Sequence, residues 1–296
     1  MSGGGILIVC ILHPSPVQRM PELPEVETVR RSMSGRVIGS SIVSVEFRDF
    51  PGVVGDVLPD VFQQLVIGER FERIDRRGKH LWLAFDGGGG LFVHLMMTGQ
   101  LVLVRPGDDA LRFEHLRLGL DSGWSLAYAD QRKFGRVLRL TDEAWETIER
   151  RIGPEPLDAQ FSVEALSAAM RNRKTPIKAF LLDQRRIAGI GNIYADEGLY
   201  RAGIHPMRQT GSLDEADIER LRGAIRAVLS EGIERRGTTL SDYRDANGDV
   251  GTNAANLRVY GRGGTGICEQ CGAQLVRLVV AGRGTHICEI CQPLRD

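Results

Sequence analysis

The sequence predicts an α+β protein with a β-rich N-terminal half, a helical second half and a cysteine-bearing tail. Between residues 37 and 140, short β-rich stretches follow one another without alternating helices, which favours an antiparallel sandwich or barrel. After Gly153-Pro154-Glu155-Pro156 the hydrophobic period becomes helical. Four of the five cysteines lie after residue 267. These three observations divide the chain into a sandwich, a helical region and a metal-binding end.

Length and composition place the chain among ordinary globular proteins. It has 296 residues, of which 42% are hydrophobic and 26% charged, and this length accommodates about two domains. Such a composition argues against disorder, collagen-like repeats and a membrane-spanning class. Lys and Arg number 38, and Asp and Glu number 38, so the formal net charge is zero. A nucleic-acid partner would therefore need a local concentration of positive charge.

Residues 1–20 differ from everything that follows. The apolar run Ile6–Leu12 is far shorter than the roughly 20 residues of a transmembrane helix. It also lacks the preceding basic residues and the small-residue cleavage site of a signal peptide. We therefore expect a mis-called or disordered leader, with an added edge strand as the alternative, and a cytoplasmic protein. In that reducing compartment, clustered cysteines are metal ligands rather than disulfides.

The first regular element is a helix that starts near Pro24, runs to about Ser34 and stops at Gly35. A proline in the first turn, with Glu25 and Glu27 near the positive end of the helix dipole, is typical of a helix start. Stretches rich in strand-forming residues follow, separated by Gly and Asp. They are Val37–Phe47, Phe71–Phe85, Leu91–Val104, Leu111–Leu120 and Trp124–Leu140.

The second half begins with the Gly/Pro-rich linker at 153–156 and continues with helical patterns. A Gly-, Asn- and Asp-rich stretch, Asp242–Asn256, follows the last helix and is predicted to be a mobile loop. The expected helices are Ser162–Arg171, Ile177–Asp183, Asn192–Ala202 and Leu213–Arg235.

The four C-terminal cysteines predict a zinc site. Cys268 and Cys271 form one C-x2-C pair, and Cys288 and Cys291 form a second pair sixteen residues later. Each pair can supply two of the four ligands of a tetrahedral ion, and the chain between the pairs must cross and return to bring them together. Four thiolates leave no open coordination position, so we expect one structural zinc ion.

The chain between the two cysteine pairs reads as a hairpin. Gln274–Val280 and Thr285–Cys288 have strand-like composition, and the turn is expected at residues 281–284. Arg283 would then lie at the tip among glycines. Arg283 either binds a phosphate through its guanidinium or is a solvated turn residue.

A glycine-rich turn between two helical patterns predicts an anion site. Within Asp183–Ala202, a helix is expected to end near Gly189, Gly191 to permit a tight turn, and Asn192 to cap the next helix. Backbone N–H groups at such a helix start bind anions. The preceding segment, Arg171–Arg186, carries six basic residues and one acidic residue. This local charge of +5 favours phosphate binding, although a solvated helix face is the alternative.

Several separated motifs together resemble those of the formamidopyrimidine-DNA glycosylase family of base-excision repair enzymes, in its oxidised-purine branch. The resemblance extends from residue 21 to about residue 292. The matching segments are Pro21–Thr28 (PELPEVET), Arg77–Lys79, His94–Gly99, Asp130–Gly135, Ile152–Leu157, Ile177–Lys178, Gly189–Ala195, Val259–Arg262 and the four cysteines.

The resemblance implies a fold and a domain plan. The fold is an N-terminal antiparallel β-sandwich flanked by helices, then a helical domain with a helix-two-turn-helix and a zinc-bound β-hairpin. After the leader at 1–20, the expected domains are a catalytic sandwich at 21–152, a linker at 153–160, a DNA-binding helical domain at 161–261 and a four-cysteine zinc finger at 262–296.

The resemblance also implies a mechanism and a partner, double-stranded damaged DNA bound by a monomer. Pro21 would be the nucleophile, because a free secondary amine can attack the sugar and form an imine, whereas an amide nitrogen cannot. Glu22 would be the general acid/base, and strand nicking by β- and δ-elimination would follow. Residues assigned to catalysis or to phosphates around the lesion are Lys79, Lys178, Asn192 and Arg283. Residues assigned to the gap left by the everted base are Met97, Arg132 and Phe134.

This chain departs from the family pattern at two places. Pro21 is not residue 1, so we expect Met20 to be the true initiator and its removal to expose the Pro21 amine. Gln131 and Lys133 stand where relatives often carry Pro and Arg, which would alter the stiffness of that turn and a phosphate contact. The Asp242–Asn256 segment corresponds to the loop that covers the everted base.

Two other functions fit the same motifs. One is an endonuclease VIII-like glycosylase that prefers oxidised pyrimidines. The other is a non-catalytic, zinc-dependent binder of damaged DNA whose proline is blocked by the leader. A comparison of the release of 8-oxoguanine and of thymine glycol from DNA distinguishes the pyrimidine-preferring glycosylase from an oxidised-purine enzyme. A covalent trapping assay identifies the non-catalytic binder, because a blocked proline forms no adduct with DNA.

Overall fold

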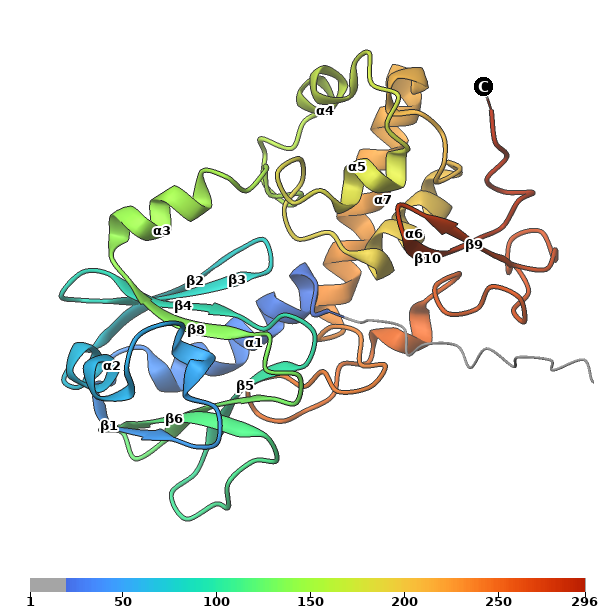
Figure 1. Ribbon diagram of the computed structural model, residues 1–296. Helices are drawn as coiled ribbons and strands as arrows, with labels where there is room; N and C mark the ends of the chain where they lie inside the picture. Colours follow the sequence, from blue (N-terminus) through green and yellow to red (C-terminus); the bar gives the residue numbers. More distant parts are fainter. Residues whose placement is uncertain (1–19, 296) are drawn as a thin grey trace, which may run out of the picture.

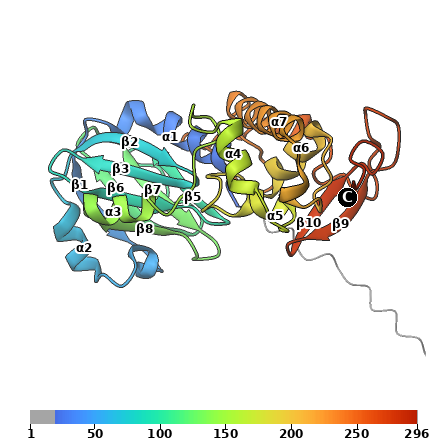
Figure 2. The same ribbon diagram turned by 90° about the horizontal axis from the view of Figure 1, so that it is seen from above.

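The computed structural model describes residues 20–295, in which a β-rich lobe lies beside a helical lobe (Figures 1 and 2). The predicted leader falls, except for Met20, outside the described residues. No helix within the described part of the chain combines the length and the apolar character needed to cross a bilayer.

The β-rich lobe is an antiparallel sandwich, as predicted. One sheet has the strand order β1-β6-β7-β5 and the other has the order β2-β3-β4-β8, and every pairing within them is antiparallel. The strands are β1 (Ile42–Phe47), β2 (Phe71–Arg77), β3 (His80–Phe85), β4 (Gly90–His94), β5 (Gly99–Val104), β6 (Glu114–Leu120), β7 (Ser125–Asp130) and β8 (Arg136–Leu140).

Helix α1 (Leu23–Val37) packs on this lobe through a single apolar face. Val26, Val29, Met33 and Val37 are fully buried, and their spacing of three to four residues places them on one side of the helix. The prediction that the helix stops at Gly35 is wrong, because Val37 continues the buried face for another half turn.

Two short helices of this lobe were not predicted. They are α2 (Pro59–Val66) and α3 (Asp142–Glu149), and a 3-10 turn covers Pro51–Val54. Helix α3 follows the last strand and places Trp145 on Trp82, with ring centroids 5.3 Å apart and nearly parallel planes. Long-range packing of this kind orders an eight-residue segment that has little periodic signal of its own.

The helical lobe surrounds the long helix α7. Its helices are α4 (Val163–Met170), α5 (Ile177–Leu182), α6 (Asn192–Ala202) and α7 (Glu215–Glu234), with 3-10 turns at Thr210–Ser212 and Asn253–Asn256. The prediction of a helix end near Gly189 is wrong. Helix α5 ends at Leu182 with Asp183 as its C-cap, and turns then carry the chain to α6.

The C-terminal hairpin consists of β9 (Val276–Val280) and β10 (Arg283–Ile287). Its turn is shorter than predicted, because Arg283 pairs with Val280 as the first residue of β10. Ala281 and Gly282 alone form the tip, and both have positive φ angles. The Arg283 side chain is exposed, so it projects from a strand end rather than from a glycine-rich tip.

Each lobe contributes residues to the other lobe's core. Leu23, at the start of α1, belongs to the core of the helical lobe, whereas Ala246 belongs to the core of the sandwich. The Ala246 N–H donates to Ser32 Oγ over 3.0 Å, and its carbonyl accepts from the Leu103 N–H over 2.7 Å. The segment predicted to be a mobile loop is therefore bound to the sandwich at its centre.

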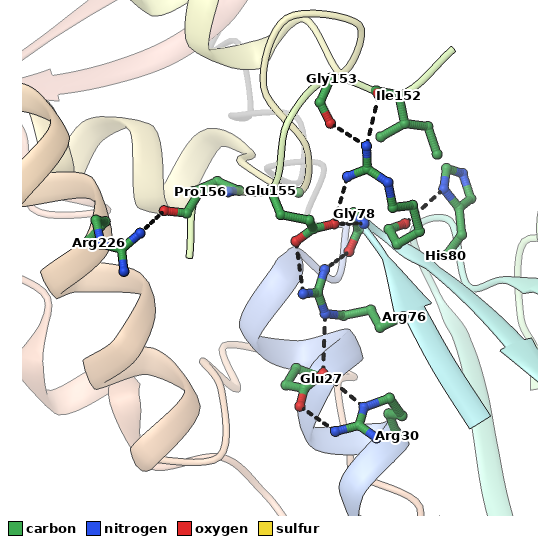
Figure 3. A network of polar contacts seen from close by, with 12 residues as sticks. Glu27, Arg30, Arg76, Gly78, His80, Ile152, Gly153, Glu155, Pro156 and Arg226 are labelled. Atoms are coloured by element: carbon green, nitrogen blue, oxygen red, sulfur yellow. Dashed lines mark hydrogen bonds and ion pairs between the residues drawn. The ribbon is translucent and has the colours of Figure 1, made fainter. Parts of the chain in front are cut away.

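A network of arginines and glutamates joins the lobes at the linker (Figure 3). Glu155 is 8% exposed and pairs with Arg76 at 2.8 Å and with Arg77 at 3.1 Å. Arg76 also pairs with Glu27 of α1 at 3.2 Å. On the other side, Arg226 of α7 donates to the Pro156 carbonyl over 2.9 Å. This network fixes the linker against both lobes.

Candidate active site and DNA interface

A pocket of about 300 Å³ lies where the two lobes meet the zinc hairpin. The start of α1, the turn between β2 and β3, the end of β4, the start of α6 and the start of β10 all contribute to it. Its lining includes Met20, Glu22, Lys79, His80, His94, Met97, Gln184, Asn192, Ile193 and Arg283. Five of the residues singled out in the sequence for DNA contact or catalysis therefore meet in one place, namely Glu22, Lys79, Met97, Asn192 and Arg283.

The Glu22 carboxylate is bound by the N-terminus of helix α6. It accepts backbone N–H groups from Gly191 at 2.7 Å, Ile193 at 2.8 Å and Tyr194 at 3.3 Å. A helix start offers such donors to an anion. The anion site predicted at the glycine turn is therefore occupied by the chain's own carboxylate, which this contact holds in a fixed orientation.

The two glycines of the turn are needed for this close approach. A Cβ on Gly191 would lie 2.3 Å from Glu22 Cδ, and a Cβ on Gly189, whose φ is +78°, would lie 2.6 Å from Leu23 Cβ. The Leu23 N–H donates to the Gly189 carbonyl over 3.0 Å. The turn thus receives the start of α1, and the helix N-cap is Gly191 rather than the predicted Asn192.

Burial raises the pKa of the Glu22 carboxyl, and the Lys79 charge and the three backbone N–H groups only partly oppose this. Its neighbour Glu25 accepts from the Glu22 N–H at 3.0 Å, the Thr238 N–H at 2.6 Å and the Tyr194 hydroxyl at 2.9 Å. Burial and the Glu22 charge raise the Glu25 pKa to about 7. At neutral pH this pair of carboxyls can hold and release a proton.

Lys79 reaches the pocket from the tight turn between β2 and β3. Gly78 adopts a φ of +58°, and its N–H donates to Glu155 Oε1 at 2.5 Å. The interlobe network therefore also fixes the turn that carries the lysine. Burial lowers the Lys79 pKa, while the charges of Glu22 and Glu25 oppose that shift and Arg283 adds to it.

Two histidines line the same pocket and were not singled out from the sequence. The rings of His80 and His94 lie 4.5 Å apart. Burial lowers their pKa values to about 4 and about 3, so both are neutral at pH 7. His94 begins the matched segment His94–Gly99, and His80 directly follows the matched segment Arg77–Lys79. This closeness to the matched segments was the available signal.

Met97, Arg132 and Phe134 come together as one cluster. Arg132 Nη1 lies 3.1 Å from Met97 Sδ, and its guanidinium carbon lies 4.8 Å from the Phe134 ring centroid. Phe134 is 49% exposed although it is a large apolar side chain, and Arg132 covers one face of its ring. The three side chains thus form an exposed group at one edge of the pocket.

A buried aspartate supports this cluster and was not predicted to do so. Asp130 is 2% exposed and accepts the Arg132 N–H at 3.1 Å and the Gly135 N–H at 2.8 Å, together with the Thr98 hydroxyl. Lys133 within the same turn has a φ of +60° and pairs with Asp49 at 3.2 Å. Asp130 therefore sets the conformation of the turn that presents Arg132.

Lys178 and Asn192 are engaged with the zinc hairpin. Lys178 is fully buried, and its ammonium lies 2.6 Å from Asp196 Oδ1. Asn192 Nδ2 donates to the Gly284 carbonyl over 2.9 Å. The basic segment Arg171–Arg186 is therefore not one uniform surface, because Lys178 points inward and Arg185 pairs with Asp183.

The geometry of the four cysteines fits a zinc ion. Their sulfur atoms all lie within 4.8 Å of one another, with Cys268–Cys291 at 3.7 Å and Cys271–Cys288 at 3.4 Å. Tetrahedral thiolates at about 2.3 Å from zinc are separated by about 3.8 Å, whereas a disulfide requires about 2.05 Å. The donor set therefore suits one four-coordinate ion.

Pro21 is buried beside this centre. A second pocket, of about 30 Å³, is lined by Pro21 and Glu25 and shares Met20, Met97 and Ile193 with the larger one. Met20, which is joined to the Pro21 nitrogen, thus lines both pockets. Pro21 and Glu22, neighbours in the PELPEVET motif, line these two adjoining pockets.

A β-sandwich joined to a helical lobe and a four-cysteine hairpin, with a pocket between them that holds Glu22, Lys79 and Arg283, defines the class of bilobal DNA glycosylases. Residues 20–137 match the formamidopyrimidine-DNA glycosylase N-terminal domain, residues 152–244 match the formamidopyrimidine-DNA glycosylase H2TH domain, and residues 268–294 match a zinc finger found in FPG and IleRS. The chain belongs to the formamidopyrimidine-DNA glycosylase family, and its cysteines bind one structural zinc ion.

Relatives match over nearly their whole length. Formamidopyrimidine-DNA glycosylase from Herpetosiphon aurantiacus is 42% identical over 92% of this chain and 100% of its own, and that from Chloroflexus aurantiacus is 45% identical over 92% and 98%. Among solved structures, a Lactococcus lactis FPG mutant bound to Fapy-dG containing DNA matches with a TM-score of 0.86 and 35% identity, covering 93% of this chain and 100% of that one. The Lactococcus lactis Fpg complex with abasic-site DNA matches with a TM-score of 0.85, at 35% identity, 92% and 100% coverage.

Proposed function

We propose that this chain is a bifunctional DNA glycosylase and AP lyase of base-excision repair that removes oxidised purines, 8-oxoguanine and formamidopyrimidines, from double-stranded DNA. The observation that carries this proposal is the position of Glu22. Its buried carboxylate, held on the α6 N-terminus, lies next to Pro21 and shares a pocket with Lys79 and Arg283. The match to bacterial formamidopyrimidine-DNA glycosylases over more than nine-tenths of the chain supports the same substrate class.

The Pro21 nitrogen is the proposed nucleophile. When it is the free N-terminal amine, it attacks the sugar C1′, the damaged base leaves, and an iminium links protein and DNA. Glu22, whose pKa is raised by burial, gives a proton to the opening sugar ring and then assists elimination. The iminium acidifies the adjacent sugar protons, so β- and δ-elimination release the two flanking phosphates and nick the strand.

Positive and wedge-forming side chains around this centre are proposed to hold the DNA. Lys79 from the sandwich and Arg283 from the zinc hairpin line the pocket with Glu22. The Asn192 amide donates to the Gly284 carbonyl and has a second N–H for a phosphate. The exposed cluster of Met97, Arg132 and Phe134 fills the gap left by the everted base, with Phe134 wedged between bases.

The site requires an unblocked Pro21. With Met20 attached, the Pro21 nitrogen is an amide, and Met20 lines both pockets. We therefore propose that the active form begins at Pro21 and works in the bacterial cytoplasm, where its DNA lies. Intact mass of protein purified from its native source should correspond to a chain that starts at Pro21.

The experiment compares two forms of the chain on duplex DNA that contains one lesion. A form that starts at Pro21 should release 8-oxoguanine and nick the strand, whereas a form that retains residues 1–20 should do neither. Faster release of thymine glycol than of 8-oxoguanine would favour the pyrimidine-specific alternative. Tight binding of damaged DNA by the Pro21 form without release or nicking would favour a non-catalytic binder.

A further inference from the structure

The zinc hairpin is joined to the helical lobe by an ion pair that is wholly removed from solvent. Lys178 lies on α5 and Asp196 on α6, and both side chains are 0% exposed. Nζ of the lysine and Oδ1 of the aspartate are 2.6 Å apart. Removal of two charges from water is unfavourable unless other polar groups bind them, so a pair of this kind requires further polar contacts around it.

Strand β10 supplies those contacts. Lys178 Nζ also donates to Thr285 Oγ1 at 2.8 Å and to the Gly284 carbonyl at 3.2 Å. The second Asp196 oxygen accepts the His286 N–H at 3.0 Å. Three consecutive residues of β10, immediately after Arg283, are therefore bound by one ion pair, and Asn192 reinforces the hold on Gly284.

The same contacts leave the lysine no means of binding a phosphate directly. An ammonium group has three N–H donors, and here three protein oxygens accept from it. A phosphate contact would require at least one of these buried bonds to break. Arg283, by contrast, is exposed and lines the pocket with Glu22 and Lys79.

We propose that the Lys178–Asp196 pair positions Arg283: it locks the start of β10 onto α5 and α6 and thereby aims the guanidinium at the DNA. Lys178 and Asp196 are positioning residues and touch neither substrate nor reacting atoms. The proposal rests on the proposed function only in taking a DNA phosphate as the partner of Arg283.

Asp196→Asn distinguishes this role from direct phosphate binding, because it keeps the lysine charge and nearly the same shape. If Lys178 contacted a phosphate, release from Asp196 would leave affinity for abasic-site duplex unchanged or raise it. A positioning pair predicts about tenfold weaker binding in D196N. It also predicts a salt dependence, measured as the slope of log K against log salt, that is smaller by about 0.9, the value for one lost phosphate contact.

Double variants make the test sharper. We expect K178M, D196N and K178M/D196N to weaken binding by similar factors, and R283A/D196N to bind no more weakly than R283A. Additive losses would show that the pair acts independently of Arg283 and would overturn the proposal, as would D196N with wild-type affinity and slope.

Hydrogen exchange of the zinc-loaded protein without DNA tests the lock independently of any activity. Amides of residues 284–287 should exchange at least tenfold faster in D196N, while those of β3 should not change. The matched control is Glu231→Gln, which breaks the exposed Arg201–Glu231 pair between α6 and α7 and should leave the hairpin unchanged. Unchanged exchange in D196N would overturn the lock even if the chain proves to be a glycosylase. Faster exchange in a chain that binds no DNA would refute the proposed function alone.

Discussion

Two buried acidic pairs near the start of α1 have similar exposure and opposite electrostatics. Glu22 and Glu25 are 3% and 2% exposed, and Glu27 and Glu155 are 7% and 8% exposed. The first pair is bound by backbone N–H groups and a tyrosine hydroxyl, and burial raises both pKa values. The second pair is bound by arginines, which outweigh burial and lower both pKa values. The partners, rather than burial itself, decide whether a carboxyl can exchange a proton or only carry charge.

The largest expected effect is the loss of chemistry when the proton-exchanging pair is changed. Glu22→Gln should lower the single-turnover rate of base release at least about 100-fold, because general acid/base catalysis contributes about 10²–10⁴-fold. The α6 N–H groups donate to both carboxylate oxygens, and the amide offers only one, so a buried N–H loses its acceptor and stability should fall by about 1–3 kcal/mol. The rate is therefore measured on the folded protein. Glu27→Gln, assayed well below its unfolding temperature, serves as the control and should keep its rate within a few-fold. Equal rate losses in both variants would erase the distinction between the pairs.

The arginine-bound pair should instead govern stability. Glu155→Gln leaves Arg76 and Arg77 at the interlobe contact without their main counter-ion. Removal of one partner of a buried pair costs about 3–5 kcal/mol, so urea unfolding should show a loss of about 3 kcal/mol. Base release by the folded fraction should slow far less than in Glu22→Gln, although Glu155 also holds the turn that carries Lys79. An unchanged urea midpoint would show that the network in Figure 3 does not hold the lobes together.

The two pairs should also respond to pH in opposite directions. The Glu27 pKa is about 2, because hydrogen bonds from Arg30 and Arg31 outweigh burial. The unfolded chain therefore binds more protons between pH 4.5 and 2, and stability falls as the pH falls through that range, by up to about 3 kcal/mol. The Glu25 pKa is about 7. The folded chain binds more protons between pH 4.5 and 7, so this group lowers stability as the pH rises.

Urea unfolding between pH 3 and 8 checks both signs. Glu27→Gln should flatten the acidic limb of the stability curve, and Glu25→Gln should flatten the decline between pH 4.5 and 7. If both variants altered the same limb, the contrast between the two acidic pairs would be wrong.

The smallest expected effect is that of changing Glu149, an exposed partner of Arg77. Glu149 lies 3.7 Å from Arg77 Nε and is 46% exposed. Because solvent screens such pairs, Glu149→Gln should change the free energy of unfolding by less than about 0.5 kcal/mol. This variant is matched to Glu155→Gln, since both contact Arg77. A loss above 2 kcal/mol would mean that burial is not what separates them.

Parts of this site were predictable from the sequence because their signals are local. The C-x2-C spacing predicts the cysteine cluster without knowledge of the fold. The motifs around Met97 and Arg132 indicated side chains that the structure brings together. The alternation of short strands likewise predicted the sandwich, since its hydrophobic pattern is contained within each strand.

Other features depend on contacts between distant segments and could not be read locally. Lys178 looks like one member of a basic run, yet its partners Asp196 and Thr285 lie 18 and 107 residues further along the chain. The anion site at the glycine turn was predicted, but its occupant, Glu22, is 169 residues before Gly191. Helix α3 escaped detection for a similar reason, because its order depends on the stacking of Trp145 on Trp82.

The most direct test of the catalytic centre is borohydride trapping on abasic-site duplex DNA, followed by peptide mapping of the adduct. A chain that begins at Pro21 should form a covalent adduct at Pro21, and Glu22→Gln should form it much more slowly. A chain with its Pro21 nitrogen still joined to Met20 should give no adduct. An adduct on Lys79 or another lysine, or trapping by a chain whose Pro21 remains in an amide bond, would contradict the assignment of Pro21 as the nucleophile.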